Sequence, residues 1–159
     1  METVRKVEPP VGENTRNSSS RVIPFLMVEG ADRVLEFMKT ALGAEEIFLM
    51  RHSTGTIWHA QVRVGDSLIM LADSMGKKEH AMPAMLYVYV DDADAYYRKA
   101  IAAGAVSVME PADQFWGDRS GGVRDSGGNV WWLATRIEDL SPEEMTRRGR
   151  DYEKQHAVR

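Results

Sequence analysis

His59 is the residue of this sequence whose type and position most clearly suggest chemistry. Within residues 56–64 two sets of side chains alternate, one with Trp58, Ala60, Val62 and Val64 and the other with Ile57, His59, Gln61 and Arg63. This two-residue period is typical of a β-strand with two distinct faces. If a helix covers the first set, His59 and Gln61 point into a cavity, where the imidazole can act as a general base. The alternative is a core histidine that is hydrogen-bonded to a neighbour.

A second candidate lies in residues 114–119, which read Gln-Phe-Trp-Gly-Asp-Arg. Trp116 offers a flat apolar surface to a ligand, and the planar guanidinium of Arg119 offers a donor fork for a carboxylate, phosphate or enolate oxygen. Alternatively, Arg119 is structural and holds the glycine-rich loop by pairing with Asp118 or Asp125. Both hypotheses stay open, because loops on a rigid scaffold often carry binding groups while arginine also ties loops.

The elements that position these residues come from an internal repeat. The similar segments are 28–32 and 90–94, 42–44 and 103–105, and 65–71 and 127–133, at offsets of 62, 61 and 62 residues. Three landmarks that keep one spacing to within a residue indicate two copies of one supersecondary unit. Periodicity and turn residues predict a strand, a helix and three strands in each copy.

The predicted elements follow the same order in both copies. The first has strands at 22–28, 46–52, 56–64 and 67–72 with a helix at 32–42, and the second has strands at 84–90, 106–109, within 114–123 and at 129–135 with a helix at 93–103. After the second copy, Ser141, Pro142 and Glu144 form a capping signal that predicts a C-terminal helix within 138–156.

These elements predict an α+β fold of two repeated βαβββ units with curved mixed sheets, plus the C-terminal helix. Residues 21–137 are expected to form a single domain, with units at about 21–73 and 84–137. Residues 1–20 are rich in proline, glycine and polar side chains and are expected to form a disordered arm.

Several short motifs carry a resemblance to a known family. They are Gly43-Ala44-Glu45, Trp58-His59-Ala60, the 114–119 segment, Val123-Arg124-Asp125, Leu133-Ala134-Thr135 and the stretch from Glu138 to Glu144. With the paired units, they resemble the vicinal oxygen chelate superfamily of glyoxalases, extradiol dioxygenases and bleomycin-resistance proteins, and more narrowly its PhnB-like branch. The resemblance implies sheets that surround a cup-shaped cavity with the site inside it. It also implies a homodimer, in which units of two chains often build each cup.

The resemblance further implies four positions for metal ligands, one near the start of the first strand and one in the last strand of each unit. On the spacing of the repeat, they fall on Ile23, Met70, Met85 and Trp132. Isoleucine and indole offer no lone pair to a metal, and a thioether suits soft ions rather than Zn, Ni, Mn or Fe(II). No metal and no other cofactor are therefore expected.

Strand parity points a further set of side chains into the cup. The predicted ligand-binding residues are Phe25, His59, Gln61, Met70, Met85, Tyr87, Trp116, Arg119 and Trp132, with Met27 on the same face. A cavity lined mostly by aromatic and methionine side chains with a few polar groups is typical of a small-molecule pocket. The alternative is that these side chains fill the cup as core.

Composition excludes several classes of partner. The 159 residues carry a formal net charge of −4, which gives no reason to expect nucleic acid or an anionic membrane. The sequence has no cysteine and no apolar signal or membrane-length run, which predicts a cytoplasmic protein.

The predicted function is metal-free binding of a small, partly aromatic ligand in an apolar cup. The alternative is a lyase, isomerase or dioxygenase-type enzyme that uses His59 as a catalytic base or an unrecognised divalent metal site.

Overall fold

The computed structural model describes residues 21–157, so the predicted arm at 1–20 lies outside the described residues. The first unit contains β1 (Phe25–Val28), α2 (Ala31–Leu42), β2 (Glu45–Arg51), β3 (Ile57–Val64) and β4 (Ser67–Asp73). The second contains β5 (Met85–Tyr89), α3 (Ala93–Ala102), β6 (Val106–Asp113), β7 (Asp118–Arg124) and β8 (Val130–Arg136). A short 3-10 helix, η1 (Lys78–His80), lies between the units, and α4 (Pro142–His156) follows them.

Each unit builds one four-stranded mixed sheet, which confirms the predicted α+β fold of two βαβββ units and a C-terminal helix. The strand orders are β1-β4-β3-β2 and β5-β8-β7-β6. The first strand of each unit runs parallel to the last, while the other neighbours are antiparallel. The helix after the first strand supplies the crossover that this parallel pairing needs.

One hydrophobic core joins the two units. Val34, Leu35 and Met38 lie on the buried side of α2, and Gly43 ends this helix in the left-handed conformation (φ 65°) that glycine favours. Phe37 of α2 packs against Trp131 of β8, with ring centroids 6.2 Å apart. The α2 helix therefore contacts the sheets of both units.

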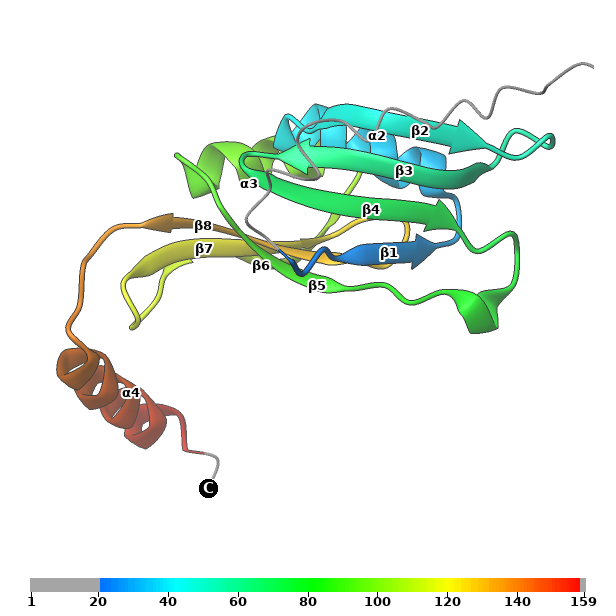
Figure 1. The fold of residues 1–159 in the computed structure, drawn as a ribbon. Coiled ribbons are helices and arrows are strands. Elements are labelled where there is room, and N and C mark those ends of the chain that lie inside the picture. Colours follow the sequence, from blue (N-terminus) through cyan, green and yellow to red (C-terminus); the bar gives the residue numbers. More distant parts are fainter. Residues whose placement is uncertain (1–20, 158–159) are drawn as a thin grey trace, which may run out of the picture.

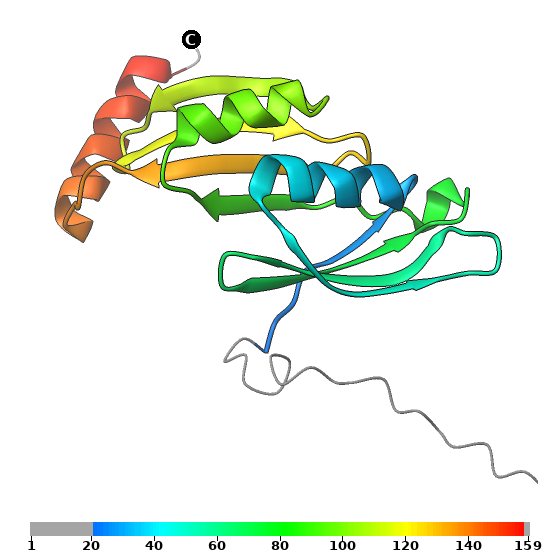
Figure 2. The ribbon, with the colours of Figure 1, turned by 90° about the horizontal axis from the view of Figure 1, so that it is seen from above.

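The helices cover one face of each sheet and leave the other free. Figure 1 shows α2 behind the first sheet, and Figure 2 shows α3 above the second sheet. We name the uncovered face of the first sheet face A and that of the second sheet face B. In the described chain, both faces carry large exposed side chains, such as Phe25 on face A and Met85 on face B, which are 45% and 75% exposed.

Three local predictions differ from the structure. The first strand begins at Phe25 rather than at residue 22. The second strand of the second unit extends to Asp113 rather than to residue 109, and a turn closed by a hydrogen bond from Gln114 N to Asp118 O (2.7 Å) precedes β7. Trp58, predicted to lie under the helix, is 56% exposed, because an irregularity in the β2–β3 pairing gives the buried position to Ile57.

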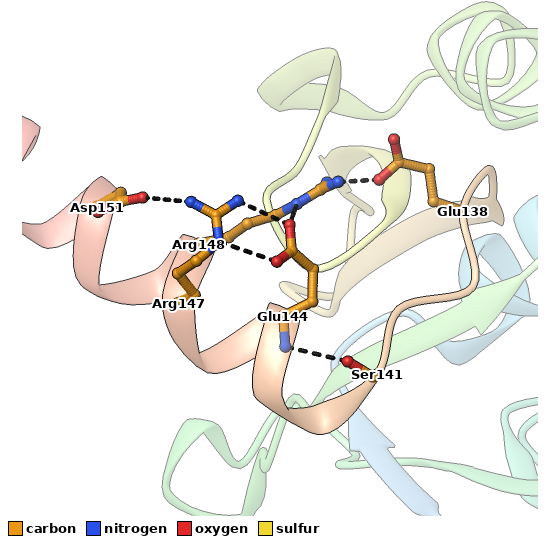
Figure 3. A network of polar contacts seen from close by, with 6 residues as sticks. All are labelled: Glu138, Ser141, Glu144, Arg147, Arg148 and Asp151. Carbon is orange, nitrogen blue, oxygen red and sulfur yellow. Dashed lines mark hydrogen bonds and ion pairs between the residues drawn. The ribbon is translucent and has the colours of Figure 1, made fainter.

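The capping signal predicted for α4 is present in part. Ser141 Oγ accepts a hydrogen bond from Glu144 N (3.1 Å), but the Glu144 carboxylate accepts from Arg147 and Arg148 instead of returning to the cap (Figure 3). None of the α4 residues is buried, and Figure 1 shows the helix beyond the end of β8, apart from both sheets. No helix among residues 21–157 has the length and apolar character to cross a membrane.

Candidate functional site

Face A places His59 among aromatic rings. Its ring centroid is 5.7 Å from that of Phe25 and 6.2 Å from that of Phe48, and its Nε2 is 3.3 Å from Gln61 Nε2. Strand register puts Met70 beside both Phe25 and Gln61 on the same face. The predicted residues of the first unit are therefore neighbours.

An open cavity of about 650 Å³ lies beside His59. Its walls include Phe25, Met50 and the stacked rings of His52 and Trp58, whose centroids are 4.6 Å apart. The volume matches that of typical small-molecule pockets. Aromatic and methionine side chains on three strands thus offer a flat ligand a large apolar contact area.

The loop after β4 forms another part of this cavity. The Asp73 carboxylate accepts hydrogen bonds from the backbone N–H groups of Ala31 (3.1 Å) and Met75 (2.7 Å). Met75 has the left-handed conformation (φ 55°) that residues other than glycine rarely adopt. The buried Ser74 hydroxyl beside this cavity has no hydrogen-bond partner among the described residues.

Face B is organised around a buried carboxylate. Asp118, which is 1% exposed, accepts hydrogen bonds from the hydroxyls of Tyr87 (2.7 Å) and Tyr89 (3.0 Å) and from Arg136 Nε (2.8 Å). Arg136 Nη2 also donates to Tyr89 (2.8 Å), and Trp116 Nε1 donates to Tyr87 (3.2 Å). We name these five residues the Asp118 cluster.

The cluster shifts the titration of its members. Burial opposes ionisation of Asp118, but hydrogen bonds from Tyr87, Arg136 and Tyr89 outweigh it and hold the pKa of this carboxyl below its usual value. Burial, with the nearby Asp118 carboxylate, raises the pKa of Tyr87. At neutral pH the cluster therefore contains the ionised carboxylate of Asp118, the protonated phenol of Tyr87 and the guanidinium of Arg136.

The other predicted residues of the second unit are divided between the two sides of its sheet. Register places Tyr87 beside Trp132, and Met85 lies on the same side of β5, so these three share face B with Trp116 of the cluster. Arg119 does not join them. Its guanidinium binds both oxygens of Asp94 in the first turn of α3 (2.6 and 2.9 Å) and Asp113 (3.0 Å), which raises the pKa of Arg119.

Sequence reasoning missed three members of the Asp118 cluster and several walls of the cavity. These residues are Tyr89, Asp118 and Arg136 of the cluster and Met50, His52 and Trp58 of the cavity. The two-residue period of a strand could have identified two of them. Tyr89 lies two residues after Tyr87 and Arg136 four residues after Trp132, so each lies on the same face as the predicted residue. Asp118 carried no such signal, since its partners are distant in sequence.

The side chains present do not fit the divalent metal site that the superfamily resemblance implies. Strand register sets Met70 opposite Phe25 and Trp132 opposite Tyr87, while Met85 begins β5. None of these side chains is a usual ligand of a divalent metal. Within the part of the chain that the structure describes, no three histidine or acidic side chains are placed to hold a metal ion.

Comparison with known proteins relates this geometry to a family. Residues 21–133 match the family model of the Glyoxalase/Bleomycin resistance protein/Dioxygenase superfamily. An uncharacterized protein from Mycobacterium bovis is 30% identical over 139 residues, which cover 81% of this chain and 91% of that protein.

Solved structures agree with this assignment at the level of the fold. TioX from Micromonospora sp. ML1 is 24% identical and has a TM-score of 0.62, covering 74% of this chain and 99% of TioX. A PhnB protein from Bacillus cereus is 21% identical with a TM-score of 0.61, covering 73% of this chain and 99% of its own. The family match, the related sequence and the two βαβββ units together show that this chain belongs to the Glyoxalase/Bleomycin resistance protein/Dioxygenase superfamily.

Proposed function

We propose that this protein binds a small, partly aromatic molecule without a metal. The ligand lies between face A of one copy of the chain and face B of a second copy. The observation that carries the proposal is the accumulation of aromatic and methionine side chains on both faces. Tyr87, Tyr89 and Met85 alternate along β5 on face B and are 43%, 56% and 75% exposed, and exposed apolar side chains that are grouped in this way are typical of an interaction surface. Within the superfamily, the proposal assigns the chain to the PhnB-like branch and to the cytoplasm.

A homodimer is part of the proposal. The helices occupy one side of each sheet, so face A and face B of the described chain lack a cover from its own elements. If face A of one copy meets face B of another, the two faces enclose a cup and each chain contributes to two equal sites. Such an isologous arrangement is the commonest one in homo-oligomers.

The metal-free part of the proposal rests on donor chemistry. A thioether at residue 70 or 85 and an indole at residue 132 leave Zn, Ni, Mn or Fe(II) without the nitrogen and oxygen ligands these ions need.

The competing proposal is an enzyme of the lyase, isomerase or dioxygenase type with His59 as general base. It is supported by the position of His59, which lies partly buried in the wall of the cavity next to Gln61. A base in this position can reach a proton of a ligand that fills the cavity.

Metal analysis and calorimetry test these proposals on the full chain. We expect the purified protein to contain no stoichiometric Zn, Ni, Mn or Fe, and to bind naphthalene-based probes that also raise its melting temperature, because a ligand of the native state stabilises it. A stoichiometric metal would overturn the metal-free proposal. Turnover that His59→Gln abolishes without loss of binding would favour the enzyme.

The oligomeric state is tested by sedimentation. Met85→Glu, which puts a charge on face B, is expected to produce monomers, whereas the matched change Ile101→Glu on α3 (38% exposed) leaves the dimer intact. Monomeric wild-type protein would contradict the shared cup.

A further inference from the structure

Several cationic side chains lie on and beside the two faces, although the whole chain has a net charge of −4. Arg136 is half-exposed at the end of β8, and the exposed Arg124 lies at the other end of face B, in register with Val130. Lys77 lines the cavity beside face A. Cationic groups that surround a site in an acidic protein favour an anionic ligand.

Two carboxylates beside these cations are already engaged inside the protein. Asp118 accepts three hydrogen bonds from Tyr87, Tyr89 and Arg136. Asp73 accepts two from backbone N–H groups. Because each carboxylate has internal donors, neither is well placed to bind a cationic group of a ligand.

Arg136 is held in one orientation and keeps free donors. Two of its N–H groups are used, one by Asp118 (2.8 Å) and one by the Tyr89 hydroxyl (2.8 Å). Its Nη1 lies 3.8 Å from the Asp139 carboxylate, which is too far for a hydrogen bond, and that carboxylate is 98% exposed. Since a guanidinium has five N–H groups, three remain for an acceptor in the described structure.

We propose that Arg136 binds an anionic oxygen pair of the ligand while the rings of Tyr87, Tyr89 and Trp116 contact its aromatic part. This inference rests on the proposed function and specifies the class of ligand as an aromatic acid. Asp118 acts as a positioning residue, because it holds the guanidinium beside the rings. Arg119 has the same side chain, but Asp94 and Asp113 occupy its donors on the other side of the sheet.

Two probes that differ in charge test the inference. 2-Naphthoate and 2-naphthamide share one ring system, and calorimetry on the full chain measures the affinity of each. We expect wild-type protein to bind naphthoate more tightly than naphthamide. Higher salt should weaken only naphthoate binding, because salt screens the interaction between charges.

Variants of Arg136 test whether this residue causes the preference for naphthoate. Arg136→Gln is expected to weaken naphthoate binding roughly ten- to hundred-fold, the worth of a hydrogen bond to a charged group, and to leave naphthamide binding unchanged. Arg136→Lys keeps the ion pair with Asp118 but lacks the fork, so an intermediate loss is expected. Arg150→Gln on the exposed surface of α4 is the matched control and should behave as wild type.

The outcomes separate this inference from the proposed function. If wild-type protein binds neither probe, the aromatic site itself is overturned and the inference with it. If both probes bind equally well, or if folded Arg136→Gln and Arg136→Lys retain the wild-type preference for naphthoate, the site stands and the role of Arg136 is overturned. Circular dichroism establishes that each variant is folded.

Discussion

The hydroxyl of Tyr87 donates a 2.7 Å hydrogen bond to the carboxylate of Asp118, which is 1% exposed. These residues come from β5 and β7, which are not neighbours because β8 lies between them. The bond therefore joins side chains across β8 on face B, and Arg136 of β8 donates to the same carboxylate. Since the phenol and the guanidinium share one acceptor, the position of each depends on Asp118.

Asp118→Asn is predicted to destabilise the protein, because a neutral amide replaces an ionised acceptor of three hydrogen bonds. The free energy of unfolding should fall by roughly 1.5–3 kcal/mol, the range for a hydrogen bond to a charged group. Urea unfolding at pH 7 measures the change. Asp139→Asn, at a 98% exposed side chain, should change it by less than about 0.5 kcal/mol. Equal stability of Asp118→Asn and wild type would contradict the cluster.

The same carboxylate predicts a pH dependence. The pKa of Asp118 in the folded protein lies below the ordinary value of 3.8, so its contribution to stability is present in full above that value. The contribution is lost as the pH falls through the lowered pKa. The stability difference between wild type and Asp118→Asn should therefore be constant from pH 7 to about pH 5 and shrink in stronger acid. A difference that grows on acidification would mean that the pKa is raised.

The repeat made most of the fold predictable from the sequence. Alternation along the strands and the glycine at residue 43 identify local elements, because their causes lie within a few residues. Trp58 is an exception. The face of the sheet on which its side chain lies depends on how β2 pairs with β3, and an irregularity in that pairing cannot be recognised from the sequence of one strand.

The candidate site was less predictable for a related reason. The alternation of side chains along a strand places Tyr87 and Trp132 on one face. The ion-pair partners of a charged residue depend instead on which distant residues the fold brings beside it. Arg119 and Arg136 are both arginines on strands of the second sheet, and only the structure shows that Asp94 binds the first while Asp118 orients the second.

Gly122→Ala is predicted to displace the ring of Trp132 on face B. A Cβ added at Gly122 would lie 2.8 Å from this ring, closer than van der Waals contact allows. Such overpacking costs roughly 1–3 kcal/mol and should shift the tryptophan fluorescence. Adding Trp132→Leu should restore part of the lost stability, which a double-mutant cycle measures. Additive effects of the two changes would show that the residues do not touch.

Phe115→Ala is predicted to loosen α4 without unfolding the sheets. The ring of Phe115 lies 5.2 Å from that of Tyr152 and packs close to Gly149, while α4 itself buries no residue. Amide hydrogen exchange in residues 142–156 should accelerate, while β7 and β8 keep their protection. Phe115 also packs edge-on against Trp116, so loss of its ring should weaken probe binding as well. Unchanged exchange in α4 would assign its anchoring to the ion pair of Arg148 with Glu138.

Glu144 provides a titration that tests the ion pairs within α4 at a single group. Hydrogen bonds from Arg147, then from Arg148, lower the pKa of its carboxyl from 4.5 to about 2 (Figure 3). Because the folded pKa is lowered, the contribution of Glu144 to helix stability is present above pH 4.5 and lost as the pH falls through about 2. Carboxyl NMR measures the titration directly, and Arg148→Gln should raise the pKa, whereas Arg150→Gln should not. High salt should raise it too, since the group is exposed and its ion pairs are screened. An ordinary pKa at low salt would show that the arginines do not hold the carboxylate in solution.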